Sequence, residues 1–215
     1  YEILHEFHTM PGGMTQEQIT NTVTYLARRL KFARIITLNA HDMKTAAMLR
    51  EHMRIPGMGL TTTRYFHDRL AMSGKAAHSG VRVPAFASII NYEVLHDYME
   101  NVPAPWLLKP RCVFSPVEVQ TLYNTEQVWK ALEDLGDNQS NFLLQQSISG
   151  DIFPIDGITA DGKVMLSSVY MTGHTFRQKA MECELADTSV VYPDFEESSR
   201  KLKAIHAALL PALGL

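Results

Sequence analysis

The sequence predicts an α/β fold in its first half and an α+β fold in its second half. Residues 15–53 alternate between helical and extended patterns, as in a parallel α/β layer. Residues 152–169 form two apolar extended runs joined by Asp161-Gly162. An Asp-Gly pair in this position indicates a hairpin, because both turn residues need a positive φ. We therefore expect an antiparallel sheet in the second half.

The first half is expected to form a helix, a strand and a second helix. Thr15 and Gln18 have the spacing of a capping box, and the apolar residues that follow recur at helical intervals. Residues 34–38 have the pattern of a short buried strand. Asp42 is expected to cap the second helix, which Pro56-Gly57 ends.

The later elements are predicted from the same kinds of signal. Gly80 is expected to end a helix over residues 65–78, and Asn91 and Thr125 are expected to cap the next two helices. Strands are expected at 106–109, 117–123, 141–145, 152–159 and 163–169. A final amphipathic helix is expected over residues 195–213.

The composition bounds the class of protein and of partner. Of 215 residues, 46% are hydrophobic and 20% are charged, which is typical of a globular protein. The net charge of -3 argues against nucleic-acid or anionic-membrane partners. No apolar run reaches the roughly 20 residues that cross a bilayer. Cys112 and Cys183 are too few for a disulfide framework or a zinc site, so we expect a cytoplasmic protein.

Two cations mark the end of the strand predicted over residues 106–109. Arg111 lies two residues after Lys109, so both side chains are expected to leave the same face. Two converging cations suit a triphosphate, because each charge-assisted hydrogen bond contributes roughly 1.5–3 kcal/mol. On spacing alone, the favoured alternative is a lysine that is merely solvated at the end of a strand.

A second candidate is the polar link that follows the strand at 141–145. Such a link offers free backbone donors and acceptors beside an apolar wall, which the edge and faces of an adenine require. Asp151 would accept from ribose hydroxyls, and the alternative is a plain connection with Asp151 in a turn.

A third candidate lies at the start of a predicted helix. Asp68 is expected to be a capping residue, and Arg69 is either a solvated charge or a phosphate contact.

These features, taken in order, resemble the ATP-grasp superfamily, and the resemblance is greatest to the bacterial carboxylate–amine ligases. It is carried by residues 55–58 with 64–69, 80–84, 107–111 with Ser115, 142–156 and 212–215. The resemblance implies a partial pre-ATP-grasp α/β layer over residues 1–60. It also implies a partial ATP-grasp domain over 61–215, made of a first part (61–104), a small lid-like subdomain (105–150) and the start of a C-terminal subdomain (151–215).

The resemblance also implies an ATP site. It assigns Lys109 to the phosphates and the N7 side of adenine, and Arg69 to the phosphates. Gln146 takes the place of the family's hinge glutamate. Ser115 would lie in the loop that closes on the phosphates, and Ser147 and Ile148 would supply the hinge backbone contacts. The full set of implied ATP-binding residues is Arg69, Lys109, Arg111, Ser115, Gln145, Gln146, Ser147, Ile148 and Asp151.

The sequence departs from the family pattern in two places. The loop at 112–118 lacks the family's usual glycine, and Ile152 stands where an acidic ribose ligand is common. The chain opens on Tyr1 and stops inside a helical pattern at Leu215, so we expect it to be part of a longer protein. By the family's pattern, the catalytic residues and the Mg²⁺ ligands would follow Leu215, and this chain alone would be inactive.

The activity implied is that of an ATP-dependent ligase. It would use ATP and Mg²⁺ to activate a small carboxylate as an acyl phosphate, which an amine then attacks. A homodimer is one assembly state open to such an enzyme. Two alternatives stay open: a biotin-carboxylase-type enzyme, whose carboxylate is bicarbonate, and a non-catalytic relative that binds nucleotide.

Overall fold

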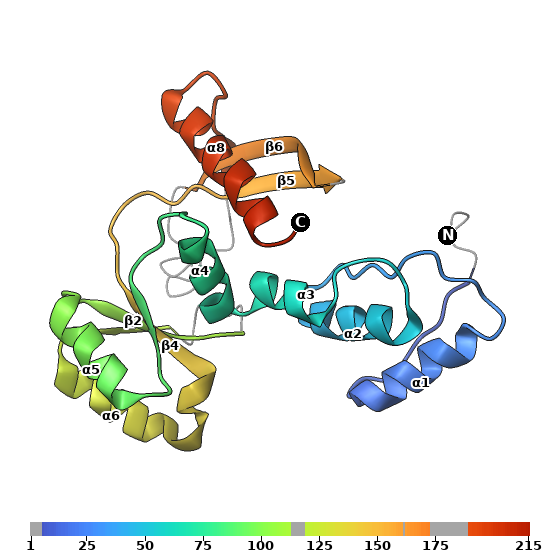
Figure 1. Cartoon of the computed structure of the whole chain (residues 1–215), viewed down its shortest axis with the longest axis horizontal. Coiled ribbons are helices and arrows are strands. Elements are labelled where there is room, and N and C mark those ends of the chain that lie inside the picture. The colour runs from blue at the N-terminus through green and yellow to red at the C-terminus, as the bar shows by residue number, and fades with distance from the viewer. Residues whose placement is uncertain (1–5, 113–118, 161, 173–188) are drawn as a thin grey trace. The chain divides into compact units, whose positions relative to one another are not determined.

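The computed structural model describes residues 6–112, 119–160, 162–172 and 189–215 (Figure 1). The chain divides into two compact units, Tyr1–Thr63 and Arg64–Leu215, and helix α3 (Leu60–His67) runs from one into the other. None of the described helices combines the length and the apolar character needed to span a lipid bilayer.

The first unit consists of helices in its described part. Helix α1 (Gln16–Leu26) begins at the predicted capping box, in which the Thr15 hydroxyl accepts from the Gln18 N–H and the Gln18 side chain accepts from the Thr15 N–H. A 3₁₀ turn (Ala40–Asp42) precedes helix α2 (Met43–Met53). The capping role predicted for Asp42 is wrong, because Asn39 caps the 3₁₀ turn instead and Asp42 makes no capping bond.

The buried strand predicted over residues 34–38 is also wrong. The segment is extended but has no strand partner in the described part of the first unit, and Ile36 and Leu38 are 78% and 101% exposed. The Ile35 carbonyl accepts from the Arg50 guanidinium at 2.8 and 3.0 Å. A parallel α/β layer is therefore not observed over residues 6–60, the described part of this range, since a strand needs a neighbouring strand to satisfy its backbone.

The second unit is built on a four-stranded antiparallel sheet. Its strand order is β1 (Phe86–Ser88), β4 (Phe142–Gln146), β2 (Trp106–Pro110) and β3 (Gln120–Leu122). Strands β2 and β4 pair over their whole length, from Trp106 opposite Gln146 to Pro110 opposite Phe142. The strands predicted over 106–109 and 141–145 are confirmed to within one residue, and residues 117–118 lie outside the described part.

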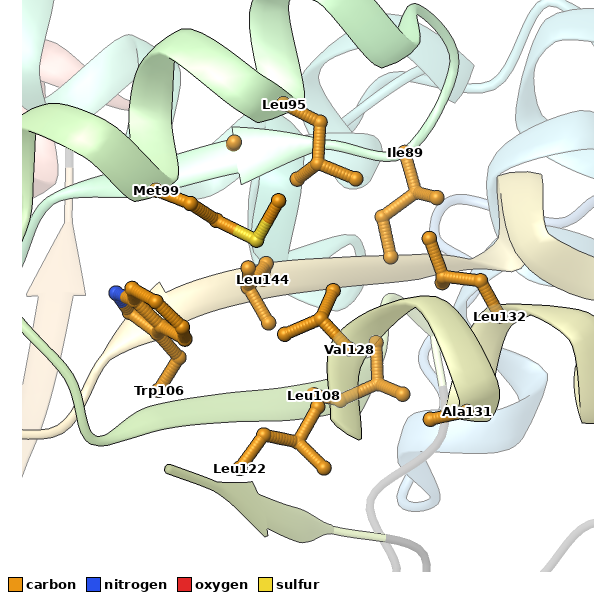
Figure 2. Packing of buried hydrophobic residues seen from close by; sticks show 11 residues of the cluster. Ile89, Leu95, Met99, Trp106, Leu108, Leu122, Val128, Ala131, Leu132 and Leu144 are labelled. Carbon is orange, nitrogen blue, oxygen red and sulfur yellow. The ribbon is translucent and has the colours of Figure 1, made fainter. Parts of the chain in front are cut away.

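Two helices cover one face of this sheet. Helix α5 (Tyr92–Asn101) and helix α6 (Thr125–Leu135) contribute Leu95, Met99, Val128 and Leu132 to a buried cluster (Figure 2). The strands contribute Ala87, Trp106, Leu108, Leu122 and Leu144. Asn91 caps α5 as predicted, whereas Asn124 rather than Thr125 caps α6, so that prediction was one residue too late. A 3₁₀-helix (Gly136–Asn141) leads from α6 into β4.

The single helix predicted over residues 65–78 is two helices. Helix α3 ends at His67 and helix α4 (Arg69–His78) begins after Asp68, whose carboxylate accepts from the N–H groups of Leu70 and Ala71. The capping role predicted for Asp68 is confirmed. Gly80 has a φ of +80°, and the chain turns away from α4 there as predicted.

The last part of the chain forms a second antiparallel sheet and a helix. The predicted hairpin is confirmed as β5 (Ile155–Ala160) paired with β6 (Lys163–Thr172), although residue 161 of its turn lies outside the described part. Strand β7 (Ser189–Val191) pairs with β6. Helix α8 (Glu197–Ala212) packs on this sheet, where the absent side chain of Gly157 leaves room for His206.

The buried cluster makes a testable prediction about stability. Leu144→Ala removes a fully buried side chain and should lower the free energy of unfolding by about 2–5 kcal/mol. Leu166→Ala is the matched control, because that leucine lies on β6 and is 60% exposed, and it should change the free energy by about 0.5 kcal/mol or less. Urea unfolding followed by circular dichroism measures both, and equal effects would contradict the assigned core.

Candidate functional site

Strands β2 and β4 present one row of side chains to the core and another to the opposite face. Along β2, Trp106, Leu108 and Pro110 are buried, while Leu107 and Lys109 alternate with them and point the other way. In β4, Leu143 lies opposite Lys109 and Gln145 lies opposite Leu107. Since cross-strand partners share a face, Lys109 and Gln145 both lie on the face that α5 and α6 leave uncovered.

Lys109 is a half-buried cation. Burial lowers the pKa of its ammonium group, and the nearby positive charge of Arg69 lowers it further. Lys109 makes no ion pair with any of the described residues. A half-buried ammonium group under these conditions favours the arrival of an anion, because the anion's charge would offset both effects.

Arg69 is held beside the end of β2 by its own backbone and side chain. It is the first residue of α4, its N–H donates to the Arg111 carbonyl at 2.9 Å, and its guanidinium donates to the Pro110 carbonyl. These bonds bring Arg69 next to Lys109, although 40 positions separate them in the sequence. Two of the predicted site residues are thus close together in the structure.

Arg111 does not leave the sheet face alongside Lys109. Strand β2 ends at Pro110, so the alternation that would have placed Arg111 beside Lys109 does not continue. Its guanidinium instead makes a two-pronged ion pair with Asp68, with distances of 2.6 Å from Nη2 to Oδ2 and 3.2 Å from Nε to Oδ1. The predicted convergence of two free cations on one face is therefore wrong for Arg111.

The Asp68–Arg111 pair is the principal buried charge interaction of this region. Burial alone would raise the pKa of Asp68, but the hydrogen bonds and positive charge of Arg111, together with the N–H groups of Ala71 and Leu70, lower it overall. The same hydrogen bonds raise the pKa of Arg111. Both groups are therefore ionised at neutral pH, and the charge of Arg111 is already balanced.

The link after β4 holds the predicted hinge residues. Gln146 lies opposite Trp106, on the side of the core, so it is Gln145 and not Gln146 that shares a face with Lys109. The Gln146 N–H donates to the Ala85 carbonyl and the Ser147 N–H donates to the Pro105 carbonyl, at 2.8 and 2.9 Å. These two donors are already used, so neither can bind a ligand without breaking a bond within the protein.

The other predicted residues are more exposed. The Ile148 side chain is 64% exposed, and Asp151 is exposed in the link before β5. Ser115 lies outside the described residues. Lys109 lies opposite Leu143, so three residues, or about 10 Å along β4, separate it from Gln146. The sheet face therefore offers a cation toward one end and a polar link at the other.

Two cavities in the described part of the chain lie away from this face. One cavity of about 500 Å³ lies in the first unit beside α1 and α2, and another of about 700 Å³ lies between α4, β1 and α5. Neither is lined by Lys109, Gln145 or Ile148. Leu143, which lies opposite Lys109 on this face, is fully buried, so other parts of the chain already cover the face at that point.

A metal site does not accompany the cations in the described part of the chain. The group that could hold an ion there is His96, Asp97 and Glu100, three exposed residues of α5. Helix α5 packs on the face of the sheet opposite Lys109, so this group could not bridge an anion bound beside Lys109. The prediction that Mg²⁺ ligands lie elsewhere stays a prediction.

Comparison with known proteins adds independent evidence. No protein-family model matches the sequence. The L-arginine-specific L-amino acid ligase of Bacillus subtilis is 24% identical over 144 residues, which cover 64% of this chain and 35% of the relative. The alanine–anticapsin ligase of Bacillus subtilis (strain 168) is 20% identical over 228 aligned positions, which cover 95% of this chain and 46% of the relative.

Solved structures also match most of the chain. The L-amino acid ligase from Bacillus licheniformis superposes with a TM-score of 0.73 at 18% identity, covering 96% of this chain and 48% of that one. The chain has an ATP-grasp fold. The ATP complex of D-alanine–D-alanine ligase from Bacillus anthracis matches with a TM-score of 0.63 at 16% identity, covering 90% and 63% of the two chains.

The ATP-grasp resemblance predicted from the sequence is thereby confirmed, as are the mixed helices and antiparallel sheets. The chain spans less than half the length of the two curated relatives that it matches. The sequence did not predict the Asp68–Arg111 pair. The one signal available was the cap at Asp68, and no local pattern links it to an arginine 43 positions away.

The ion pair makes a prediction about stability. Asp68→Asn keeps a capping side chain but leaves Arg111 without its counter-charge, so it should lower the free energy of unfolding by about 2 kcal/mol at pH 7. Because the folded-state pKa of Asp68 lies below the ordinary 3.8, this stabilisation is complete above that pH and is lost as pH falls through the lowered pKa. The difference between wild type and variant should therefore shrink in acid.

Urea unfolding at pH 7 and at successively lower pH values measures this difference. Glu197→Gln is the control, because it removes an exposed ion pair with Lys201 and should cost about 0.5 kcal/mol or less. A difference that stays constant into strong acid would contradict the assignment to Asp68.

Proposed function

We propose that this chain supplies the ATP-binding part of an ATP-dependent ligase that joins a carboxylate to an amine. In this proposal ATP phosphorylates the carboxylate, and the amine attacks the acyl phosphate. The ATP-grasp fold and the names of the similar proteins support this class of reaction. We assign the proposed ATP-grasp domain to residues 61–215 and the ATP to the sheet face that carries Lys109.

The observation that carries the proposal is the state of Lys109. A half-buried ammonium group beside a second cation costs free energy unless an anion joins it, and a triphosphate supplies that anion. The simpler interpretation of Lys109 is a solvated strand end, and the half-burial of its side chain beside Arg69 favours an anion site over it.

The base of the nucleotide is proposed to lie at the other end of this face. The Gln145 amide can accept from the exocyclic amino group of adenine, and the backbone of Ile148 can contact the ring edge beyond the donors already used by Gln146 and Ser147. This assignment moves the hinge side chain from Gln146 to Gln145. Asp151 is proposed to accept from the ribose hydroxyls.

The protein's contribution to the reaction is proposed to be positioning and charge stabilisation. Lys109 and Arg69 would orient the triphosphate and balance the charge that develops on the transferred phosphoryl group. Mg²⁺, where bound, supplies further charge neutralisation between phosphate oxygens. We propose that its ligands come from other parts of the protein that contains this chain.

Replacing Lys109 tests the nucleotide site directly. Lys109→Ala removes a charge-assisted contact of roughly 1.5–3 kcal/mol, so the Kd for ATP should rise about 10- to 100-fold in calorimetric titration. Lys130→Ala is the matched control, since Lys130 is an exposed lysine of α6 on the other side of the sheet, and its Kd should stay unchanged. Undiminished affinity in Lys109→Ala would refute the site.

The lowered pKa of Lys109 adds a prediction about pH. ATP requires the charged ammonium group, so wild-type affinity should fall as pH rises through that lowered pKa, earlier than an ordinary lysine would allow. Lys109→Arg keeps its charge throughout this range and should remove the pH dependence, whatever its affinity at neutral pH. A wild-type affinity that stays flat into alkaline pH would contradict the role of Lys109.

Product analysis tests the reaction class. The full-length protein, given ATP and Mg²⁺, should release phosphate only when both a carboxylate and an amine are supplied, and mass spectrometry should find the amide. Phosphate release with bicarbonate and biotin, without an amine, would instead identify the biotin-carboxylase type. ATP binding without turnover on any substrate would identify a non-catalytic relative.

A further inference from the structure

Asp68 is a junction between two elements that are remote in the sequence. Its buried carboxylate, 5% exposed, accepts from the first-turn N–H groups of Leu70 and Ala71 at 3.0 and 3.4 Å. The same carboxylate accepts from Nε and Nη2 of Arg111, which follows β2. One side chain therefore ties the start of α4 to the end of β2.

Arg111 extends this junction to a third element. Its Nη1 donates to the Ser140 carbonyl at 3.1 Å, and its N–H donates to the Asn141 carbonyl at 2.8 Å, both in the turn that leads into β4. Its own carbonyl accepts from the Arg69 N–H. All three nitrogens of the guanidinium therefore donate to acceptors within the protein. Its planar shape matches the two oxygens of the carboxylate in a single geometry.

The two proposed phosphate-binding cations flank this junction. Arg69 directly follows Asp68, and Lys109 precedes Arg111 by two residues. We propose that Asp68 and Arg111 are positioning residues, whose ion pair holds Arg69 and Lys109 together against their mutual repulsion so that both can contact the same phosphate chain. This inference rests on the proposed function, because it assigns a role within the same nucleotide site.

Positioning and simple electrostatics predict opposite changes in ATP affinity when Asp68 loses its charge. Removing the negative charge of Asp68 makes the surroundings more positive, which by Coulomb's law alone would tighten the binding of ATP. Loss of positioning weakens it, because the two cations no longer converge. The direction of the change in affinity therefore separates positioning from charge balance.

Asp68→Asn is the first test. It retains an amide oxygen that can cap α4 but not the charge that holds Arg111, and the Kd for ATP should rise at least about tenfold. Glu197→Gln, which removes an exposed ion pair on α8, should leave the Kd unchanged. An Asp68→Asn protein that binds ATP as tightly as wild type, or more tightly, would overturn the proposal.

Arg111→Lys is the second test and guards against a folding defect in the first. Lysine keeps the positive charge but cannot make the two-pronged bond to Asp68. If Arg111 were a direct phosphate contact, this variant would bind ATP nearly as well as wild type. Positioning predicts instead a weakening of at least about tenfold, together with faster hydrogen exchange of the Leu70 and Ala71 amides.

The double variant Asp68→Asn/Arg111→Lys completes the experiment. If the two residues act through one shared ion pair, the Kd of the double variant should not exceed the higher of the two single-variant Kd values. If they act independently, the two fold-increases in Kd should multiply. Multiplied effects would overturn the proposal. If wild-type protein itself fails to bind ATP, the proposed function fails and this inference falls with it. If wild type binds ATP and all the variants match it, this inference alone fails.

Discussion

The structure of the second unit depends on which face of the central sheet is buried. Helices α5 and α6 supply the apolar side chains that cover one face, and Trp106, Leu108 and Leu144 of strands β2 and β4 pack against them. Because side chains alternate along a strand, this choice also decides what the other face carries. Lys109 and Gln145 are displayed there as a consequence of the packing behind them. A slip of one residue in β2 would turn the charge of Lys109 toward the core.

The ion pair of Asp68 connects the start of helix α4 to the end of strand β2, a contact that strand pairing within a sheet does not provide. Strands place their side chains on the two faces of a sheet, whereas the proposed phosphate site needs donors that approach from more than one side. Helix α4 brings Arg69 to the end of β2 with its first turn, and the Asp68–Arg111 pair fixes that approach. The pair is largely buried and satisfied on both sides, so it contributes to stability as well as to geometry.

The sequence predicted the features that depend on neighbours in the chain. The capping box at Thr15, the caps at Asp68 and Asn91 and the β5–β6 hairpin follow from contacts a few residues apart. Predictions failed where the decision is made by distant residues. Residues 34–38 are apolar enough for a strand but have no strand partner among the described residues. Arg111 has the spacing of a second site cation but meets a carboxylate 43 positions away.

The link after β4 was likewise only partly predictable from the sequence. The sequence located a polar link after an apolar strand, but its residues could be assigned only once the register of β4 was known. Strand β4 stays paired on both sides as far as Gln146 and Ser147, whose N–H groups are taken by Ala85 and Pro105. A ligand edge can therefore meet unused backbone groups only beyond these two donors. Since Gln145 is the last β4 side chain on the Lys109 face, a nucleotide lying between them would be read by one side chain within the sheet and by backbone just outside it.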